Sequence, residues 1–227
     1  ALRNNTLALS GTILPARADT LDISDGLIVD ADDRRERMAL AELARIAFFR
    51  PDTLPPDFQP EMTVARHHVP RGQPFAFTNG IQAAHVEVEI ETGFVKLLKH
   101  WVVEDCGRII NPQLVDEQIR GGVVQGIGAA LFEECIYGAD GQMQNGTLAD
   151  YLVPMAGEMP DIVVDHVSTP TAYSELGAKG VGEAGTAASA AAVLNAVNDA
   201  LRPLGARVTT IPLTPDRVLA ALGKLDA

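Results

Sequence analysis

One carboxylate stands out in the glycine-rich segment 176–186, because the residues around it are small. The carboxylate is Glu183, and the glycines of the segment are Gly177, Gly180, Gly182 and Gly185. Glycine lacks the Cβ that keeps a backbone away from a ligand, and it tolerates positive φ. The alanine-rich run that follows favours a helix, so the segment should lead into a helix N-terminus. Free N–H groups and the positive end of the helix dipole would suit an anionic cofactor there, with Glu183 at its edge.

Other interpretations of this segment stay open. Taken alone, a glycine-rich turn with a solvated Glu183 is the more frequent outcome. No Gly-Lys-Ser/Thr closes the segment as in a Walker loop, and its glycine spacing is not a convincing dinucleotide-binding fingerprint. An unrelated binder of anions or nucleotides that uses the glycine loop is a further alternative.

A second candidate site lies in a helix that is predicted to begin at Pro112 and to run to about Leu131. Four interior glycines each cost about 1 kcal/mol of helix stability relative to alanine. They are Gly121, Gly122, Gly126 and Gly128. A ligand or another backbone against this face would explain them, and Gln118 and Gln125 on the same stripe could present amides to a bound molecule. A tightly packed helix pair with two solvated glutamines is an equally good alternative.

The composition restricts the classes of partner. The 227 residues carry a formal net charge of −12, which argues against nucleic acid and anionic membrane surfaces. Cys106 and Cys135 have no second Cys or His at metal-ligand spacing, so we expect no metal ligated by this chain. No apolar run reaches the ~18 residues of a membrane span, and the N-terminus lacks the apolar core of a signal peptide. Low cysteine usage fits a reducing compartment, so we expect the cytoplasm.

Hydrophobic periodicity predicts strands interleaved with helices. Helices are expected over residues 1–14, 37–49, 112–131, 186–201 and 215–225. Strands are expected over residues 21–29 and 85–103 as hairpins, and over 61–69, 161–168 and 207–213. Thr186 or Ser189 should cap the helix that follows the glycine-rich segment. His67 and His68 would point to opposite faces of their strand and could not share a metal ion. We predict an α+β fold with mixed sheets and packed helices.

Four motifs occur in order along the chain, and their combination is much more specific than any one of them. They are Asp105-Cys-Gly-Arg-Ile-Ile-Asn-Pro112, Gln118-Ile-Arg-Gly-Gly-Val-Val-Gln-Gly126, Asp150-Tyr-Leu-Val-Pro154 and Gly177-Ala-Lys-Gly-Val-Gly-Glu-Ala-Gly185. Together they closely resemble the C-terminal part of the molybdenum-binding large subunit of the xanthine oxidase/aldehyde oxidoreductase family, the molybdenum hydroxylases. The last motif looks most like bacterial carbon-monoxide-dehydrogenase-like members. The resemblance covers nearly the whole chain.

The resemblance implies that residues 1–227 form the second molybdopterin-binding domain of such a subunit. Glu183 aligns with the family's catalytic base, which takes a proton from a molybdenum-bound hydroxyl or water so that the oxygen attacks an electrophilic C–H carbon of a small molecule. Gln118 aligns with a glutamine near the cofactor. The residues that would line the cofactor's rim are Lys179, Gly180, Val181 and Gly182. The cofactor would be molybdenum-molybdopterin, in the cytosine dinucleotide form that is usual in bacterial members.

The resemblance also implies partners. A complete large subunit of the family is much longer than this chain, so we expect a split-gene subunit or a fragment that is active only with the N-terminal half of the large subunit. Electrons would pass to iron–sulfur clusters and FAD on an iron–sulfur subunit and a flavin subunit. The substrate would be an aldehyde, an N-heterocycle or a similar small molecule. A non-catalytic scaffold that only holds the catalytic half is the alternative, and the presence of Glu183 and Gln118 argues against it.

Overall fold

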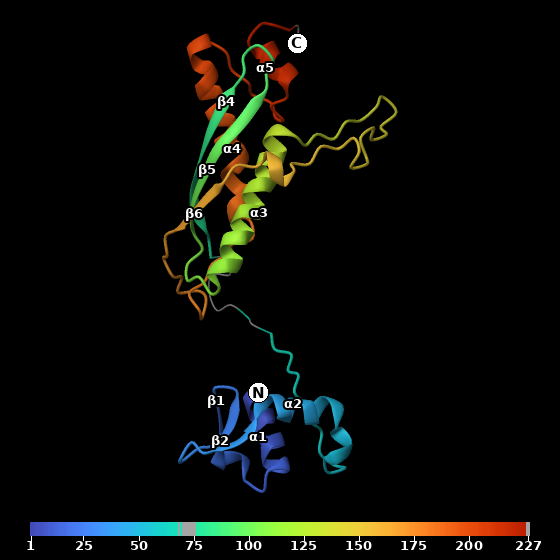
Figure 1. Cartoon of the computed structure of the whole chain (residues 1–227), viewed down its shortest axis with the longest axis vertical. Coiled ribbons are helices and arrows are strands. Elements are labelled where there is room, and N and C mark those ends of the chain that lie inside the picture. The colour runs from blue at the N-terminus through green and yellow to red at the C-terminus, as the bar shows by residue number, and fades with distance from the viewer. Residues whose placement is uncertain (68, 70–75, 226–227) are drawn as a thin grey trace. The chain divides into compact units, whose positions relative to one another are not determined.

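The computed structural model describes residues 1–67, 69 and 76–225, and it divides the chain into two compact units, Ala1–Val69 and Pro70–Ala227 (Figure 1). No helix in the described residues is both long and apolar enough to cross a membrane. The two helix-bearing units and their sheets confirm the predicted α+β class. The extent of the domain in the complete protein stays a prediction.

The first unit packs two helices and a small antiparallel sheet around its own apolar core. Its elements are α1 (Leu2–Ile13), β1 (Leu21–Ser24), β2 (Leu27–Asp30), β3 (Glu36–Ala39) and α2 (Leu40–Phe49). The predicted hairpin is confirmed, and its turn places Asp25 and Gly26 at positive φ, as a two-residue hairpin loop requires. The core is built from α1, the sheet and α2, with Leu9, Ile28 and Leu43 fully or almost fully buried.

Two predictions for this unit are wrong. The helix expected from residue 37 begins at Leu40, because Met38 pairs with Ile28 and the preceding residues form the third strand, β3. The strand expected over 61–69 is absent from residues 61–67 and 69, where the segment instead attaches to α1: Asn5 Nδ2 donates to the Glu61 carbonyl at 3.1 Å. His68, the second member of the histidine pair, lies outside the described residues.

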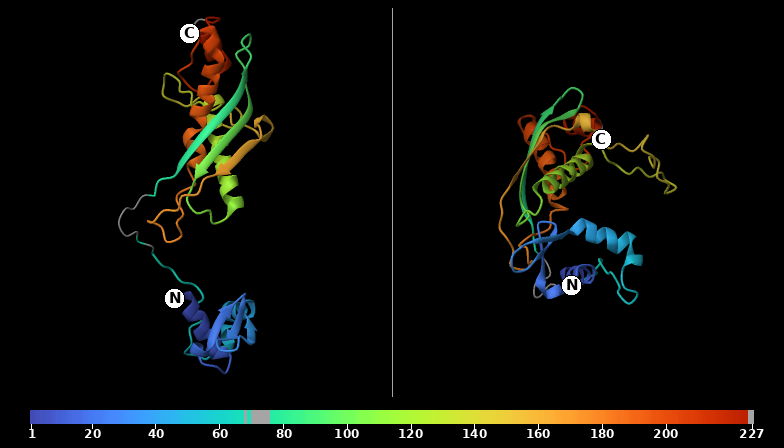
Figure 2. Two further views of the ribbon diagram at one scale, coloured as in Figure 1. Left: turned by 90° about the vertical axis from the view of Figure 1, so that its left-hand side faces the viewer. Right: turned by 60° about the horizontal axis from the view of Figure 1, so that its bottom comes forward.

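The second unit is a mixed three-stranded sheet with two long helices packed against one face (Figure 2). Its strands are β4 (Asn79–Val88), β5 (Val95–Asp105) and β6 (Ile162–His166), and its helices are α3 (Pro112–Leu131), α4 (Ala184–Leu201) and α5 (Pro215–Ala221). Strands β4 and β5 form the predicted antiparallel hairpin, and β6 joins β5 in parallel. The predicted helix over 112–131 and the predicted strand within 161–168 are confirmed.

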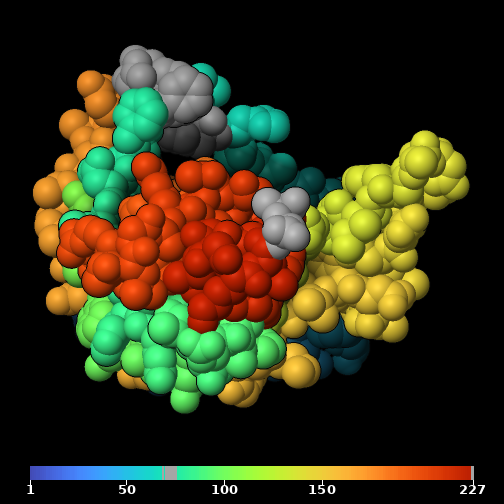
Figure 3. All heavy atoms as spheres, turned by 90° about the horizontal axis from the view of Figure 1, so that it is seen from above, coloured from blue at the N-terminus to red at the C-terminus, as the bar shows by residue number. Residues whose placement is uncertain are grey.

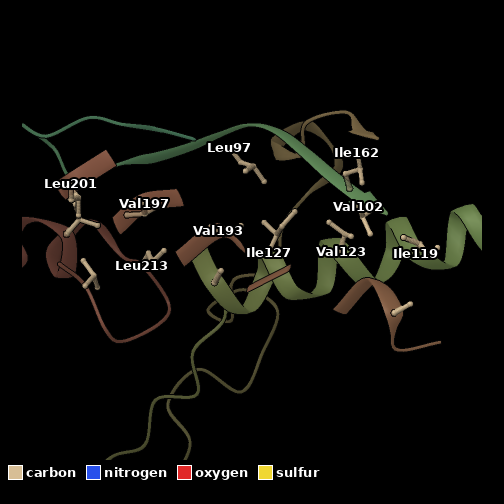
Figure 4. Packing of buried hydrophobic residues seen from close by; sticks show 14 of the residues in the cluster. Leu97, Val102, Ile119, Val123, Ile127, Ile162, Val193, Val197, Leu201 and Leu213 are labelled. Atoms are coloured by element: carbon tan, nitrogen blue, oxygen red, sulfur yellow. The ribbon is translucent and has the colours of Figure 1, made fainter. Parts of the chain in front are cut away.

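The core of this unit lies between the sheet and the helix pair (Figure 4). Side chains from the sheet, α3 and α4 meet there without contact to solvent: Val102, Ile119, Val123, Ile127, Val193 and Val197 are at most 1% exposed. The two helices approach closely through glycines. A Cβ at Gly122 would lie 3.0 Å from the Gly185 Cα, and Gly126 faces Ser189. The helix-pair interpretation of these two glycines is therefore correct.

Three details of the second unit differ from the predictions. Residues 207–213 form no strand, because the Asn198 side chain bonds both backbone groups of Val208, at 2.9 and 2.8 Å. Helix α4 begins at Ala184 with Glu183 as N-cap, and Thr186 does not cap it because its hydroxyl donates to the Gly122 carbonyl at 3.0 Å. Helix α5 ends at Ala221, before Gly223, which has positive φ.

Candidate functional site

The glycine-rich segment connects β6 to α4 and carries Glu183 at the start of that helix. The Glu183 carbonyl accepts hydrogen bonds from the N–H groups of Thr186 and Ala187, at 3.0 and 3.1 Å. Its carboxylate makes no capping bond to the helix, and the residue is exposed. The backbone of Glu183 is therefore held by the helix, while its side chain stays available. Glu183 lines a cavity of about 190 Å³ with Thr78, Asn79, Gly80, Glu104, Ala184, Ala187 and Ala188.

The two glutamines on the α3 stripe bind the glycine-rich segment and the start of α4. Gln118 Nε2 donates to the Gly182 carbonyl at 3.2 Å, directly before Glu183. Gln125 Oε1 accepts from the Thr186 hydroxyl at 3.2 Å. The helix-pair interpretation predicted two solvated glutamines, and this part of it is wrong because both side chains bind the segment or the start of α4. The structure thus brings Gln118 and Glu183 together from positions that are far apart in the sequence.

Lys179 anchors the first half of the segment, residues 176–179, to Asp105 at the end of β5. Its ammonium lies 2.9 Å from Asp105 Oδ2 and 2.7 Å from the Thr169 hydroxyl, and its side chain is only 9% exposed. Hydrogen bonds from the Thr169 hydroxyl and N–H, and then the Lys179 ammonium, hold the pKa of Asp105 well below its usual range. The Lys179 ammonium is thus occupied by this ion pair. Only the backbone of Lys179 is left to contact the rim of a cofactor.

The motif that begins at Asp105 and the glycine-rich segment are bonded to each other. Gly107 and Ala178 form an isolated β-bridge, and Lys179 N–H donates to the Cys106 carbonyl at 2.8 Å. Gly107 and Gly177 both have positive φ, and a Cβ at Gly107 would overlap with the Gly177 carbonyl. Two motifs that are separate in the sequence are therefore one structural unit. The roles of Asp105 and Thr169 were not predicted from the sequence, although the Asp-Cys-Gly triplet was a usable signal.

The second half of the segment, from Gly180 to Glu183, has an open backbone. None of its four N–H groups donates a hydrogen bond to another described residue. A Cβ at Gly180 or Gly182 would meet nothing within 4 Å. Unpaired N–H groups before a helix N-terminus are a favourable environment for an anionic group. The residues present therefore fit a phosphate-bearing cofactor such as molybdopterin that approaches the backbone closely.

Strand β4 supports the first turn of α4 from the other side. Gln82 Nε2 donates to the carbonyls of Ala184 and Gly185 at 3.2 and 3.0 Å. Gln82 Oε1 lies 3.0 Å from His100 Nε2, and burial lowers the pKa of His100 to about 4. The imidazole is therefore neutral at pH 7, with Nε2 as the donor to Gln82. Neither role was predicted from the sequence, because both depend on pairing between β4 and β5.

A second carboxyl group lies in the cavity of Glu183. Glu104, near the end of β5, is only 3% exposed, and burial raises the pKa of its carboxyl. Gly80 faces it on β4, where a Cβ would overlap with the carboxylate. Glu104 was not predicted as a site residue from the sequence. Along β5, Glu104 lies two residues after Val102 and four after His100, so it points to the same face of the sheet as these two buried side chains.

Comparison with known proteins assigns the family. Residues 1–160 match the model described as "Molybdopterin cofactor-binding domain". The chain belongs to this family. The large subunit of nicotine 6-hydroxylase from Paenarthrobacter nicotinovorans is 37% identical over 221 residues, which are 97% of this chain and 27% of that protein. The large chain of carbon monoxide dehydrogenase from Hydrogenophaga pseudoflava is 31% identical over 198 residues, 87% of this chain and 24% of that protein.

The solved structures agree with this assignment. Quinoline 2-oxidoreductase from Pseudomonas putida 86 superposes with a TM-score of 0.72 at 37% identity, over 98% of this chain and 28% of that one. The chain thus spans about a quarter of the length of these relatives. The predicted membership of the xanthine oxidase family and the predicted fold of a molybdopterin-binding domain are confirmed. The individual roles predicted for Glu183, Gln118 and the residues from Lys179 to Gly182 stay predictions.

Proposed function

We propose that this molybdopterin-binding domain contributes the catalytic base, Glu183, to a molybdenum hydroxylase that oxidises a C–H carbon of a small molecule with oxygen from water. One observation carries the proposal. An exposed carboxylate lines a cavity, and its own N–H group and the three before it have no partner in the described residues. The N–H groups suit an anionic cofactor, and the carboxylate at its edge suits a base.

When bound, the molybdenum cofactor supplies the two-electron oxidant and makes the attacking water more acidic. The chain's part is to place a proton acceptor at that water. Because the Glu183 carboxylate makes no bond to its own helix, it keeps its acceptor atoms for this purpose. Gln118 holds the segment through the Gly182 carbonyl, and Lys179 fixes the segment's other half on Asp105. These contacts restrict the segment before a substrate arrives, as a base in acid–base catalysis requires.

The substrate class follows from the relatives only as a proposal. Nicotine 6-hydroxylase and quinoline 2-oxidoreductase carry N-heterocycles in their names, and both are 37% identical to this chain over nearly all of its length. Among the predicted substrate classes we therefore favour an N-heterocycle. No contact in the described residues selects one ring over another, and we propose that the rest of the large subunit does so.

The remaining partners are also proposals. An arm of residues 134–155 extends away from the helices of the second unit (Figures 1 and 3). It carries exposed apolar side chains, among them Leu148, Leu152 and Met155. Exposed apolar groups of this kind are typical of protein interfaces. We propose that the N-terminal half of the large subunit covers them, that iron–sulfur and FAD-bearing flavin subunits accept the electrons in the cytoplasm, and that the cofactor is the cytosine dinucleotide form.

The proposal is tested by Glu183→Gln in the assembled enzyme, with Glu175→Gln as the matched control. Both residues are exposed carboxylates close to each other in the sequence. If Glu183 is the base, its replacement lowers kcat by a factor of about 10²–10⁴ while molybdenum content is unchanged. The control keeps wild-type turnover. Wild-type turnover of a fully loaded Glu183→Gln enzyme contradicts the proposal and favours the scaffold alternative.

A further inference from the structure

A row of three polar side chains, Glu104, His166 and Asp116, leads from the Glu183 cavity across the sheet of the second unit to helix α3. Gly80 on β4 is the partner of Glu104 on β5, and Glu104 is the partner of His166 on β6. Directly paired residues on neighbouring strands point to the same face of a sheet. Because residue 80 is a glycine, the Glu104 carboxylate occupies the space over β4 that a side chain would fill. Glu104 therefore lies between the cavity and His166.

His166 continues the row to helix α3. Its Nε2 lies 2.7 Å from Asp116 Oδ1, while its Nδ1 is buried and has no hydrogen-bond partner among the described residues. An ionised carboxylate can only accept a hydrogen bond, so in the neutral ring Nε2 carries the hydrogen. The buried Nδ1 then presents a lone pair. The Asp116 side chain is 34% exposed, so the row ends at the protein surface.

Glu104 has the properties of an intermediate proton carrier. Burial raises the pKa of its carboxyl, a hydrogen bond from Gln82 acts in the opposite direction, and His166 interacts with it electrostatically. Glu183 lines the same cavity, and Arg120 on α3 pairs with Glu117 rather than with Glu104 or His166. The cavity of about 190 Å³ can hold several waters, each of which occupies about 30 Å³ in the liquid. Waters can therefore connect Glu183 to Glu104.

We propose that Glu104, His166 and Asp116 form a proton route that carries the proton gained by Glu183 from the cavity to the surface of α3. The inference rests on the proposed function of Glu183. In the first step an O–H bond of Glu183 breaks and an O–H bond of Glu104 forms, through cavity water. In the second, the Glu104 carboxyl turns toward His166, its O–H bond breaks and an N–H bond forms at His166 Nδ1. Asp116 stabilises the imidazolium and takes its Nε2 proton, which passes to solvent water. The ring then exchanges its remaining proton from Nδ1 back to Nε2. No electrons are transferred in these steps.

The route is tested first without any cofactor, by following His166 in the full chain through ¹⁵N–¹H correlation spectra of its imidazole over a pH series. Wild type should show the Nε2–H tautomer at high pH. Glu104→Gln should shift the His166 Nδ1 resonance, because an amide replaces the carboxyl that hands on the proton. Asp116→Asn should disturb the tautomer itself, because the acceptor for Nε2–H is lost. Glu117→Gln, next to Asp116 on the same helix, is the matched control. A His166 Nδ1 resonance that responds to Glu104→Gln no more than to the control overturns the proposal.

The second test uses the assembled enzyme. Glu104→Gln should lower kcat about tenfold or more, leave KM and molybdenum content unchanged, and raise the solvent isotope effect on kcat. Asp116→Asn should raise the isotope effect in the same way. Because the Asp116 side chain is partly exposed, this variant should fold even if Glu104→Gln does not, and it then serves as the test. If Glu183→Gln abolishes turnover but both variants keep wild-type kcat and isotope effect, the route is wrong and the proposed function stands. If Glu183→Gln is fully active, the proposed function itself fails.

Discussion

The ends and the middle of the glycine-rich segment use glycine for opposite reasons. At Gly177 and Gly185 the chain is crowded: a Cβ at Gly177 would approach Pro170 to 2.9 Å, and one at Gly185 would approach the Val123 nitrogen of α3 to 2.8 Å. At Gly180 and Gly182 a Cβ would meet nothing within 4 Å. The first pair is required by the fold of this chain, and the second leaves a surface open. A glycine-rich motif can thus combine structural and ligand-facing positions, and only packing distinguishes them.

Gly185→Val should have the largest effect on the folded chain. The new side chain would overlap with the Ile119 carbonyl and the Val123 nitrogen, which are backbone atoms and cannot turn aside. We expect the free energy of unfolding to fall by about 3 kcal/mol or more, measured by urea denaturation. Gly121→Ala on exposed α3 surface is the control and should be neutral or stabilising by up to about 1 kcal/mol. Equal urea midpoints for Gly185→Val and wild type would show that the helices do not approach closely here.

Lys179→Met, which removes the anchor of the first half of the segment, should destabilise the chain less severely than Gly185→Val. It leaves the Asp105 carboxylate buried without its cation, which is costly because a charge has been withdrawn from water. We expect Tm to fall by about 5 °C in a thermal scan. Lys96→Met, an exposed lysine on β5, should leave Tm close to that of wild type. A Tm for Lys179→Met equal to that of the Lys96 variant would mean that the ion pair is not a structural anchor.

The same anchor predicts a pH dependence. The pKa of Asp105 is lower in the folded chain than in the unfolded chain, so the unfolded chain binds more protons as the pH falls. The contribution of Asp105 is therefore fully present above its unfolded pKa of about 3.9 and is lost progressively below it. Unfolding free energies measured between pH 5 and pH 3 should decrease less steeply in Asp105→Asn than in wild type. Asp161→Asn, at an exposed site, should keep the wild-type slope, and equal slopes in all three chains would contradict the assignment.

Gly182→Ala should have the smallest effect on stability and a specific effect on cofactor binding. The added methyl group enters open space, so the free energy of unfolding of the chain should change by less than about 0.5 kcal/mol. In the assembled enzyme we expect molybdenum content to fall several-fold, because the methyl group would occupy the space left for the cofactor. Gly157→Ala, at another open glycine, should load normally. Normal loading of Gly182→Ala would show that the open half of the segment does not face the cofactor.

The parts of the fold that were predicted correctly have local causes. Pro112 marks the first turn of α3, and alternation with a Thr92-Gly93 turn identifies the β4–β5 hairpin. The errors have non-local causes. Strand β3 exists because it pairs with β2, and residues 207–213 are not a strand because Asn198 occupies the backbone groups of Val208. Periodicity does not report which distant group will take a hydrogen bond.

The sequence by itself determined the family and the principal helices and hairpin, and it singled out Glu183 and Gln118, whose roles stay predictions. The family follows from short motifs, and the helices and the hairpin follow from local hydrophobic periodicity. Only the tertiary structure decided that the Lys179 ammonium is taken by Asp105, that Gly185 is packed while Gly182 is open, and that Glu104 shares the cavity with Glu183. The physical reason is that a side chain's charge, burial and free space depend on the strands and helices that pack beside it.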